Sequence, residues 1–321
     1  MGKTAKIAFT VGAVLLLVGF VIFGGVMSIM SWDFSKLSTN KYEENSYVIT
    51  EEFKSVSVDG EVADIEFIPA DDGNYSVKCY EQSNMKHSVS VKDGVLVIET
   101  IDTRKWYNYI GINVGTPKIT VHIPKGEYGA LSVKASTGSV EVARDFVFSS
   151  IDISVTTGSV KSYASASGEM KIKTSTGYIR IEDVNVGSLD LSVTTGKVNV
   201  KNLTSLGNVS VNVTTGDAEL TDVRCKNLSS SGSTGDLELG NVIAEERFSI
   251  KRSTGDVEFE RCDAGEIKIE TSTGDVEGTL LSEKIFIANT DTGDKEIPNT
   301  ASGGRCEITT DTGDIEIRIA R

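Results

Sequence analysis

The amino-acid sequence predicts an all-β fold: a single-stranded parallel β-solenoid (β-helix) with about 19–20 residues per coil, preceded by one transmembrane helix. Three features carry this prediction: a turn motif at a constant interval, two short alternating apolar runs within each interval, and an uncharged apolar run near the amino terminus. Successive glycines of the motif are 19 or 20 residues apart, which indicates a repeat architecture. The motif occurs ten times, and each occurrence contains one Thr-Gly pair: Thr137-Gly138, Thr157-Gly158, Thr176-Gly177, Thr195-Gly196, Thr215-Gly216, Thr234-Gly235, Thr254-Gly255, Thr273-Gly274, Thr292-Gly293 and Thr312-Gly313.

The first expected element is residues 7–30, an apolar run without a charged side chain. At about 1.5 Å per residue, a helix of this length crosses a hydrocarbon core of about 30 Å. Lys3 and Lys6 precede the run and the first charge after it is Asp33, so the positive-inside bias places residues 1–6 in the cytoplasm and the rest outside. A cleaved signal peptide is the alternative, although no Ala-x-Ala-like cleavage site closes the run. The expected location is the cell membrane, crossed once.

Residues 31–46 are polar and lack an apolar period, which predicts a juxtamembrane linker. Residues 47–130 contain short runs in which apolar and polar residues alternate, such as Val56 and Val58, separated by turn signals such as Asp93-Gly94. This pattern predicts irregular β-coils that cap the first regular coil, because a solenoid needs an atypical end unit to cover its core.

An aromatic and basic segment, residues 104–111, interrupts the irregular coils. Its rings Trp106, Tyr107 and Tyr109 are candidate partner-binding residues for lipid headgroups, a glycan or an envelope protein, since Trp and Tyr favour such interfaces. The alternative is that these rings cover the end of the core.

Residues 131–321 are predicted to form the regular solenoid. Positions two and four after each glycine are mostly apolar, as in Val198 and Val200, and a second apolar pair precedes the next glycine, with Ile285 and Ile287 as one such pair. Two strands of about five residues and two connections use the whole interval, so no helix fits. Ten coils stacked at about 4.8 Å make a rod roughly 50 Å long.

The residue after the glycine becomes acidic in the last six repeats. Stacking places these carboxylates in one column about 5 Å apart, where like charges repel by roughly 1 kcal/mol per pair even at the dielectric constant of water. Calcium would offset this repulsion, because it prefers oxygen ligands. The alternative is that Asp is a good turn residue that bonds nearby backbone amides. The candidate metal ligands are Asp217, Asp236, Asp256, Asp275, Asp294 and Asp314, with Asp291 and Asp311 near the end of the column.

The carboxyl-terminal strand carries Glu316, Arg318 and Arg321 and is expected to be the last strand of the rod. Charges on an exposed edge discourage end-to-end pairing. Oligomeric state is left open by this pattern.

Composition excludes a general nucleic-acid binder. The chain has 46 acidic and 32 basic residues, a net charge of −14, and residues 211–321 alone hold 23 acidic against 12 basic side chains. Binding to phosphate backbones needs a basic surface. No nucleic acid is therefore expected among the partners.

The chain has four cysteines, Cys79, Cys225, Cys262 and Cys306. Cys225 and Cys262 are about two coils apart, roughly 9–10 Å at sheet spacing, which exceeds the Cα separation of a disulfide. Free, mostly buried thiols are expected. No Cys-x-x-Cys occurs and the histidines are His87 and His122, so no zinc site is predicted, and calcium at the aspartate column is the one candidate cofactor.

Catalytic motifs are absent from the sequence, and the connections between strands are nearly constant in length, so no cleft is built within the repeats. The chain is expected not to be an enzyme. A carbohydrate-active β-helix enzyme is the alternative from another class, and a structural self-assembling spacer is a third.

Three stretches resemble the bacterial "putative adhesin" family of unknown function, which is related to the toast-rack domains. They are Phe53-Lys54-Ser55-Val56-Ser57-Val58, then Ile119-Thr120-Val121-His122-Ile123-Pro124 followed by Leu131-Ser132-Val133, and the Ser-Thr-Gly-Asp-Val turns. The resemblance covers about residues 47–321. It implies a β-helix-like domain that is commonly tethered to the membrane, with some relatives linked to envelope stress responses and no catalytic residues.

Together these features predict a membrane-anchored, extracytoplasmic β-solenoid that acts without catalysis in binding, adhesion or stress sensing at the cell envelope.

Overall fold

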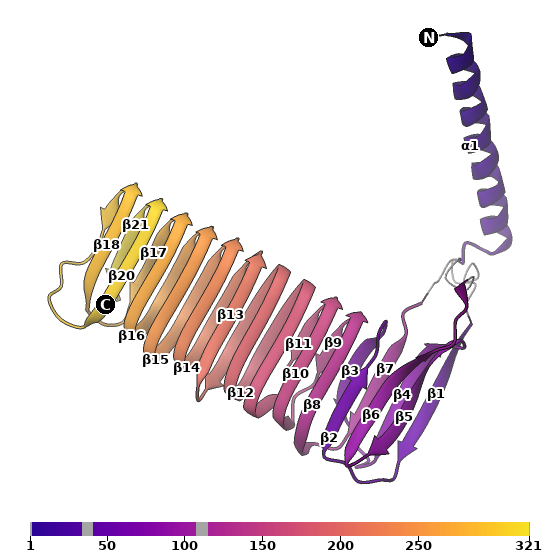
Figure 1. Ribbon diagram of the computed structural model, residues 1–321, viewed down its shortest axis with the longest axis horizontal. Coiled ribbons are helices and arrows are strands. Elements are labelled where there is room, and N and C mark those ends of the chain that lie inside the picture. The colour runs from indigo at the N-terminus through magenta and orange to yellow at the C-terminus, as the bar shows by residue number, and fades with distance from the viewer. Residues whose placement is uncertain (1, 34–40, 107–114, 321) are drawn as a thin grey trace.

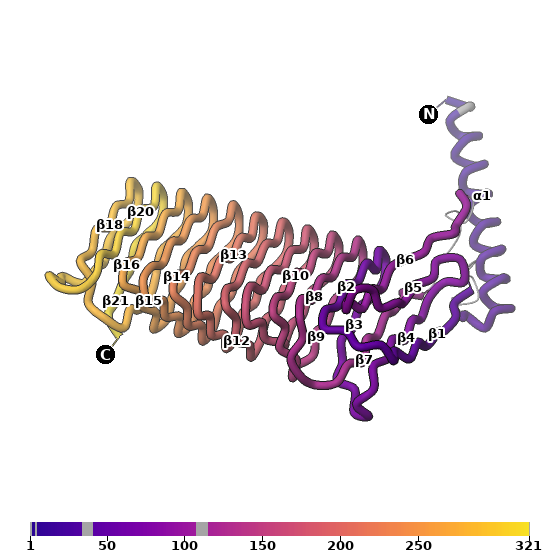
Figure 2. The backbone as a smooth tube through the Cα atoms, turned by 60° about the horizontal axis from the view of Figure 1, so that its bottom comes forward, coloured from indigo at the N-terminus to yellow at the C-terminus, as the bar shows by residue number. Residues whose placement is uncertain are grey.

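The computed structural model describes residues 2–33, 41–106 and 115–320. In this part of the chain the predicted fold class is confirmed: a β-solenoid of about ten turns follows one apolar helix near the amino terminus (Figure 1). The coils stack into a straight rod, and the tube view shows their regular spacing (Figure 2).

Helix α1 spans Lys3–Ile29 and lies beyond the end of the rod that carries β1 to β7 (Figure 1). Its segment Ala5–Ile29 has a mean hydropathy of 2.6 and none of its most apolar window is buried against the rest of the protein. The helix is therefore long and apolar enough to cross a membrane, a property that a membrane anchor and a signal sequence share.

The amino-terminal cap combines antiparallel and parallel pairing. Strand β4 runs antiparallel to β1 and to β7, and β5 runs antiparallel to β6, so these strands form a small sheet at the end of the rod. Strand β1 begins at Tyr42, within the segment predicted as a linker. The cap strands are β1 (Tyr42–Ile49), β2 (Ser55–Asp59), β3 (Asp64–Pro69), β4 (Tyr75–Gln82), β5 (Met85–Lys92), β6 (Val95–Asp102) and β7 (Lys118–Ile123).

Parallel ladders then run along the rod, because each coil places the same residues beside the same positions of its neighbour. Val198, for example, faces Ala218, which faces Leu237 in the next coil. The strands are β8 (Gly126–Thr137), β9 (Val140–Val142), β10 (Phe146–Thr157), β11 (Val160–Ser162), β12 (Ser165–Ser205), β13 (Asn208–Thr215), β14 (Ala218–Thr234), β15 (Leu237–Thr254), β16 (Val257–Thr273), β17 (Val276–Leu280), β18 (Lys284–Thr292), β19 (Lys295–Glu296), β20 (Gly304–Thr312) and β21 (Ile315–Ile319).

The geometry at the corners of the coils explains why glycine recurs in every repeat. All ten motif glycines have φ between 120 and 149°, a region that favours glycine. A side chain at Gly177 would also overlap the carbonyl of Gly158 in the coil before it. Both conformation and stacking therefore require glycine at this corner.

Both ends of the solenoid depart from chain order. At the amino-terminal end, β2 lies between β6 and β8, and β3 lies between β7 and β9, so residues 55–69 are enclosed by coils that follow them in sequence. At the other end, β20 lies between β16 and β18, and β21 lies between β17 and β19. The last segment of the chain thus occupies the penultimate coil.

This order corrects the expectation for the end of the rod. Glu316 and Arg318 are on β21 inside the stack, Arg321 lies outside the described residues, and the terminal coil is β18–β19. Sequence could not distinguish the two orders, because the last repeats are interchangeable: Thr312 aligns with Thr273 on one side and with Thr292 on the other.

The terminal coil also corrects the assignment of Ile285 and Ile287 to the core. In the register of β18 and β20, Phe286 aligns with buried Cys306, so Ile285 and Ile287 point outward and are 49% and 40% exposed. The error arose because β18 is apolar on both faces. The other apolar pairs fill a continuous core along the rod.

Arg252 is a charged residue whose side chain lies inside this core. Arg252 is 2% exposed and its guanidinium lies over Gly232 of the preceding coil, where the missing side chain leaves room. Nη2 donates a hydrogen bond to Oγ of Ser230 at 3.1 Å, whereas Nε and Nη1 have no partner among the described residues. Burial lowers the pKa of Arg252, and the charges of Asp236 and Asp217 partly oppose that shift.

Candidate functional site

The six predicted aspartates form one column along the rod. Within it, the carboxylate of one coil accepts a hydrogen bond from the backbone amide of the next aspartate. One oxygen of each of these five carboxylates therefore closes a corner. The bonds run from the amide of Asp236 to Oδ1 of Asp217 (3.2 Å), Asp256 to Asp236 (2.9 Å), Asp275 to Asp256 (2.8 Å), Asp314 to Asp275 (2.7 Å) and Asp294 to Asp314 (2.7 Å).

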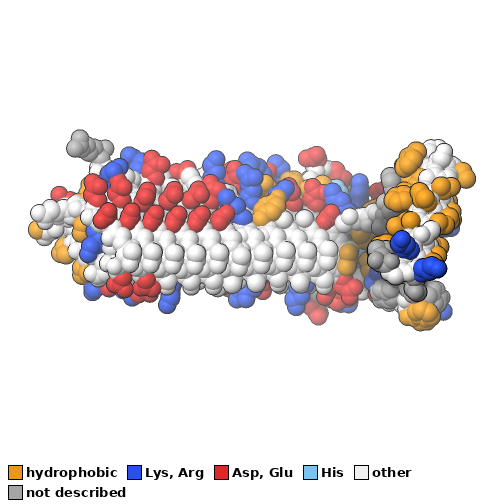
Figure 3. Space-filling model, turned by 90° about the horizontal axis from the view of Figure 1, so that it is seen from above, with side chains coloured by type: hydrophobic (Ala, Val, Ile, Leu, Met, Phe, Trp, Pro, Cys, Tyr) orange, Lys and Arg blue, Asp and Glu red, His pale blue; other side chains and the backbone are white. Residues whose placement is uncertain are grey.

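A second acidic column, which the sequence reasoning missed, runs beside the first. It lies three residues after the motif glycine in each of the last six repeats, so its side chains point to the same face as the aspartates. The two rows are visible along the rod in Figure 3. Its members pair in register: Glu219, Glu238, Glu258, Glu277, Glu316 and Glu296. The signal was present in the sequence as a second residue at constant phase. We call the two columns together the acidic face.

The electrostatics of the acidic face are unbalanced at its centre. Glu219 at one end and Glu316, next to the other end, have basic partners, in Lys197 at 3.6 Å and in Arg318. Partial desolvation, and then the charges of Glu316 and Asp275, raise the pKa of Glu277 above its ordinary value. A groove over this face is lined by all the glutamates of the column except Glu296, and by Gly240 and Gly278. The face is therefore a concentrated, exposed negative surface.

Beside the acidic face, the motif threonines form an uncharged column. They are exposed and pair in register from coil to coil, as Thr215 does with Thr195 and Thr234. Together the columns form a flat, periodic, polar surface.

The opposite corner of the coils has its own hydrogen-bonded column, which the sequence reasoning also missed. Asp183, Asn202, Asp222 and Asn241 all have positive φ, between 51 and 60°. Asn202 donates to Asp183 at 2.8 Å and Asn241 donates to Asp222 at 2.7 Å. Asn and Asp tolerate this conformation better than other non-glycine residues, which explains their recurrence six residues after the glycine.

The predicted aromatic site is described in part. The side chain of Trp106 is 76% exposed, whereas Tyr107 and Tyr109 lie outside the described residues. Their role in partner binding stays a prediction.

All four cysteines are free and buried, as predicted. Burial raises the pKa of Cys225 and of Cys306 to about 12. Such thiols are protonated and unreactive near neutral pH.

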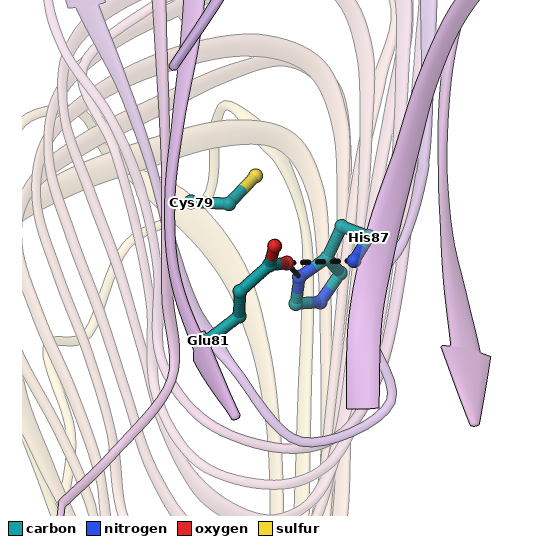
Figure 4. A group of neighbouring side chains, drawn as sticks. All are labelled: Cys79, Glu81 and His87. Atoms are coloured by element: carbon teal, nitrogen blue, oxygen red, sulfur yellow. Dashed lines mark hydrogen bonds and ion pairs between the residues drawn. The ribbon is translucent and has the colours of Figure 1, made fainter. Parts of the chain in front are cut away.

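In the cap, the structure brings Cys79, Glu81 and His87 together, a cluster that the sequence reasoning did not identify (Figure 4). Cys79 and Glu81 alternate on β4 and share a face, and His87 follows on β5 after a tight turn. Nδ1 of His87 lies 2.7 Å from Oε2 of Glu81, which also accepts the backbone N–H of His87 at 2.6 Å. The side-chain amide of Asn45 donates to Oε1 at 2.7 Å.

The fold and its surfaces define a class: a repeat β-solenoid with periodic polar faces and an apolar amino-terminal helix. Within this class, the chain belongs to the Toastrack DUF4097 family, whose model matches residues 53–217 and 203–321. The resemblance found in the sequence is thereby confirmed. Among curated protein sequences, none matches the chain significantly.

Comparison with solved structures found similar chains, and the first of those below shares the fold. A "putative adhesin" from Parabacteroides merdae ATCC 43184 aligns with a TM-score of 0.53 and 14% identity, over 88% of this chain and 98% of that one. A "putative adhesin" from Bacteroides fragilis NCTC 9343 has a TM-score of 0.42 and 14% identity, over 88% and 99%. A "putative lipid binding protein" from Parabacteroides distasonis ATCC 8503 has a TM-score of 0.44 and 19% identity, over 75% and 95%.

Proposed function

We propose that the protein is a membrane-anchored rod that acts by binding, without catalysis, on the outer side of the cytoplasmic membrane. The acidic face supports this proposal, because it repeats the same two carboxylates in register over six coils. A periodic, flat surface suits an extended ligand with repeating groups better than a single small substrate. Positive charge on the ligand complements the face, so we infer a polymer that carries amine groups.

The anchored topology rests on helix α1 and its flanks. Lys3 and Lys6 precede the apolar segment, and the positive-inside bias favours a cytoplasmic amino terminus with the rod outside. Protease added to intact cells is expected to degrade the rod and to spare an amino-terminal tag. Protection of the rod would contradict this orientation, and its release as a free soluble domain would identify α1 as a cleaved signal.

The binding experiment compares the full-length protein in detergent with the triple variant Glu238→Gln, Glu258→Gln and Glu277→Gln. These outward side chains lie at the centre of the face, and the variant keeps their size. An amine-bearing envelope polysaccharide and a basic peptide serve as probes. We expect the wild type to bind one of them with an affinity that falls as salt is added, and the variant to bind it at least about tenfold more weakly, which is about 1.4 kcal/mol.

Equal binding by both proteins would exclude the acidic face as the site. New reducing ends on the polysaccharide would support the carbohydrate-active alternative instead. The same surface would serve adhesion or envelope sensing, since both begin with binding.

A further inference from the structure

The cluster of Cys79, Glu81 and His87 lies in the cap, away from the acidic face. The side chains of Glu81 and His87 have no exposed surface, and Cys79 is also fully buried. A buried carboxylate and a buried imidazole are costly unless they are paired or coordinate a metal ion. The cluster is therefore unlike the rest of the core, which is mainly apolar.

Its geometry places three different ligand atoms together. The sulfur of Cys79, a carboxylate oxygen of Glu81 and a ring nitrogen of His87 all lie within 4.8 Å of one another. In Figure 4 the three side chains converge from the two strands of one hairpin. Within residues 2–33, 41–106 and 115–320, this is the one group of His, Cys, Asp and Glu that meets this distance.

The supporting contacts fix the ligands. Glu81 is held by the amide of Asn45 and by the backbone N–H of His87, and the hydroxyl of Tyr47 donates to the carbonyl of His87 at 3.2 Å. Such outer contacts orient ligands at metal sites. Nε2 of His87 is buried and has no hydrogen-bond partner among the described residues, so the ring is not fully satisfied by the protein alone.

We propose that Cys79, Glu81 and His87 bind one divalent transition-metal ion of the zinc class, which ties β4 to β5 within the cap. Thiolate, imidazole and carboxylate are the donors that zinc takes in proteins, and three of them leave the fourth tetrahedral position for a water molecule. The three atoms lie within 4.8 Å of one another, so small side-chain movements bring them onto one ion. On binding, the thiol of Cys79 releases its proton to become the thiolate ligand.

The test uses the full-length protein, unfolded in denaturant with chelator and refolded with Zn²⁺ or Co²⁺, since the burial of the cluster blocks entry in the folded state. We expect one ion per chain by elemental analysis. We also expect the charge-transfer absorption of a Co²⁺–thiolate bond. Cys79→Ser should abolish this absorption, whereas Cys225→Ser, a matched change at a buried cysteine without such neighbours, should retain it.

Glu81→Gln provides a second variant that keeps the size of the side chain, and circular dichroism checks that each variant folds. The Glu81→Gln variant should no longer hold one metal ion per chain. Refolded wild-type protein without bound metal, equal metal content in wild type and Cys79→Ser, or loss of the absorption in Cys225→Ser would each overturn the proposal.

Discussion

Oδ1 of Asp275 accepts a hydrogen bond from the backbone amide of Asp314 at 2.7 Å, although 39 residues separate them in the chain. The backbone amide of Asp294, the next aspartate of the column in sequence, donates instead to Asp314. These two contacts show that the carboxyl-terminal coil is inserted between two coils that precede it. The insertion leads to a direct test.

Engineered disulfides should report the order of the coils. Lys268 and Glu307 are aligned Cα partners on adjacent strands, a separation that a disulfide spans. Ile287 also aligns with Glu307 but lies one coil further out. We expect Lys268→Cys with Glu307→Cys to cross-link under mild oxidation, measured by mass spectrometry of peptides.

The control pair is Lys268→Cys with Ile287→Cys, whose Cα atoms lie two coil spacings apart, about 9–10 Å. It should stay reduced. Cross-linking of the control pair and not of the first would show that the coils stack in chain order.

Substitutions at Asp256 distinguish the two roles of the aspartate column, the hydrogen bond that closes each corner and the negative charge. Asp256→Asn keeps an oxygen that accepts the amide of Asp275, while it removes repulsion of roughly 1 kcal/mol per neighbouring carboxylate. Asp256→Ala loses the acceptor at a cost of about 1 kcal/mol. In urea unfolding at low salt, we expect the Asn variant to match or exceed the wild type and the Ala variant to be less stable. An Asn variant as unstable as the Ala variant would mean that the charge itself is required.

Adding Ca²⁺ tests whether the aspartate column is a metal site. Five of the carboxylates already use one oxygen at a corner, so we expect Ca²⁺ to raise the melting temperature no more than Mg²⁺ at equal ionic strength. A larger, saturable effect of Ca²⁺ that Asp256→Asn reduces would instead support the calcium site.

Arg252 is expected to reduce stability. Its buried guanidinium leaves Nε and Nη1 unpaired among the described residues, and each such buried donor costs about 1–3 kcal/mol. Arg252→Met keeps a long side chain over Gly232 and removes those donors. The free energy of unfolding should rise by at least about 1 kcal/mol, measured by denaturant titration. Lys251→Met, at an exposed neighbouring position, should change it by less than about 0.5 kcal/mol. A less stable Arg252→Met variant would show that the guanidinium has a partner.

Buried thiols make the fold sensitive to alkali. Burial raises the pKa of Cys225 and of Cys306 from 9.0 to about 12, so between these values the unfolded chain has lost protons that the folded chain retains. Stability is unaffected below about pH 9 and then falls by about 1.4 kcal/mol per pH unit for each thiol. The free energy of unfolding of Cys225→Ala should decline less steeply than that of the wild type from pH 9 to 11. Parallel curves would contradict a raised pKa at this site.

The repeat itself was predictable because glycine, the apolar pairs and the aspartates recur at fixed phases, and each phase corresponds to one place in a coil. The second corner was equally visible in Asp183, Asn202, Asp222 and Asn241, and it was overlooked because no glycine marks it. Coil order was beyond sequence reasoning, since Thr292 and Thr312 belong to equivalent motifs.

The two candidate sites also differ in how much of each could be predicted from the sequence. The acidic face follows from periodicity, so half of it was found directly as the aspartate column. The metal cluster depends on how β4 turns into β5, which brings His87 back to Cys79. Cys79 and Glu81 at alternate positions were its signal, but alternation alone does not show which strand lies opposite.

The inserted carboxyl-terminal coil constrains how the chain is made. On a ribosome, β18 and β19 emerge before β20 and β21, which are their ladder partners. Residues 284–296 therefore wait without these ladder partners until residues 304–319 have been made, and a chain that stops before residue 304 leaves the β18–β19 coil without the strands beside it. Truncation before residue 304 is consequently expected to affect two coils, the one that is missing and the one that loses its neighbour.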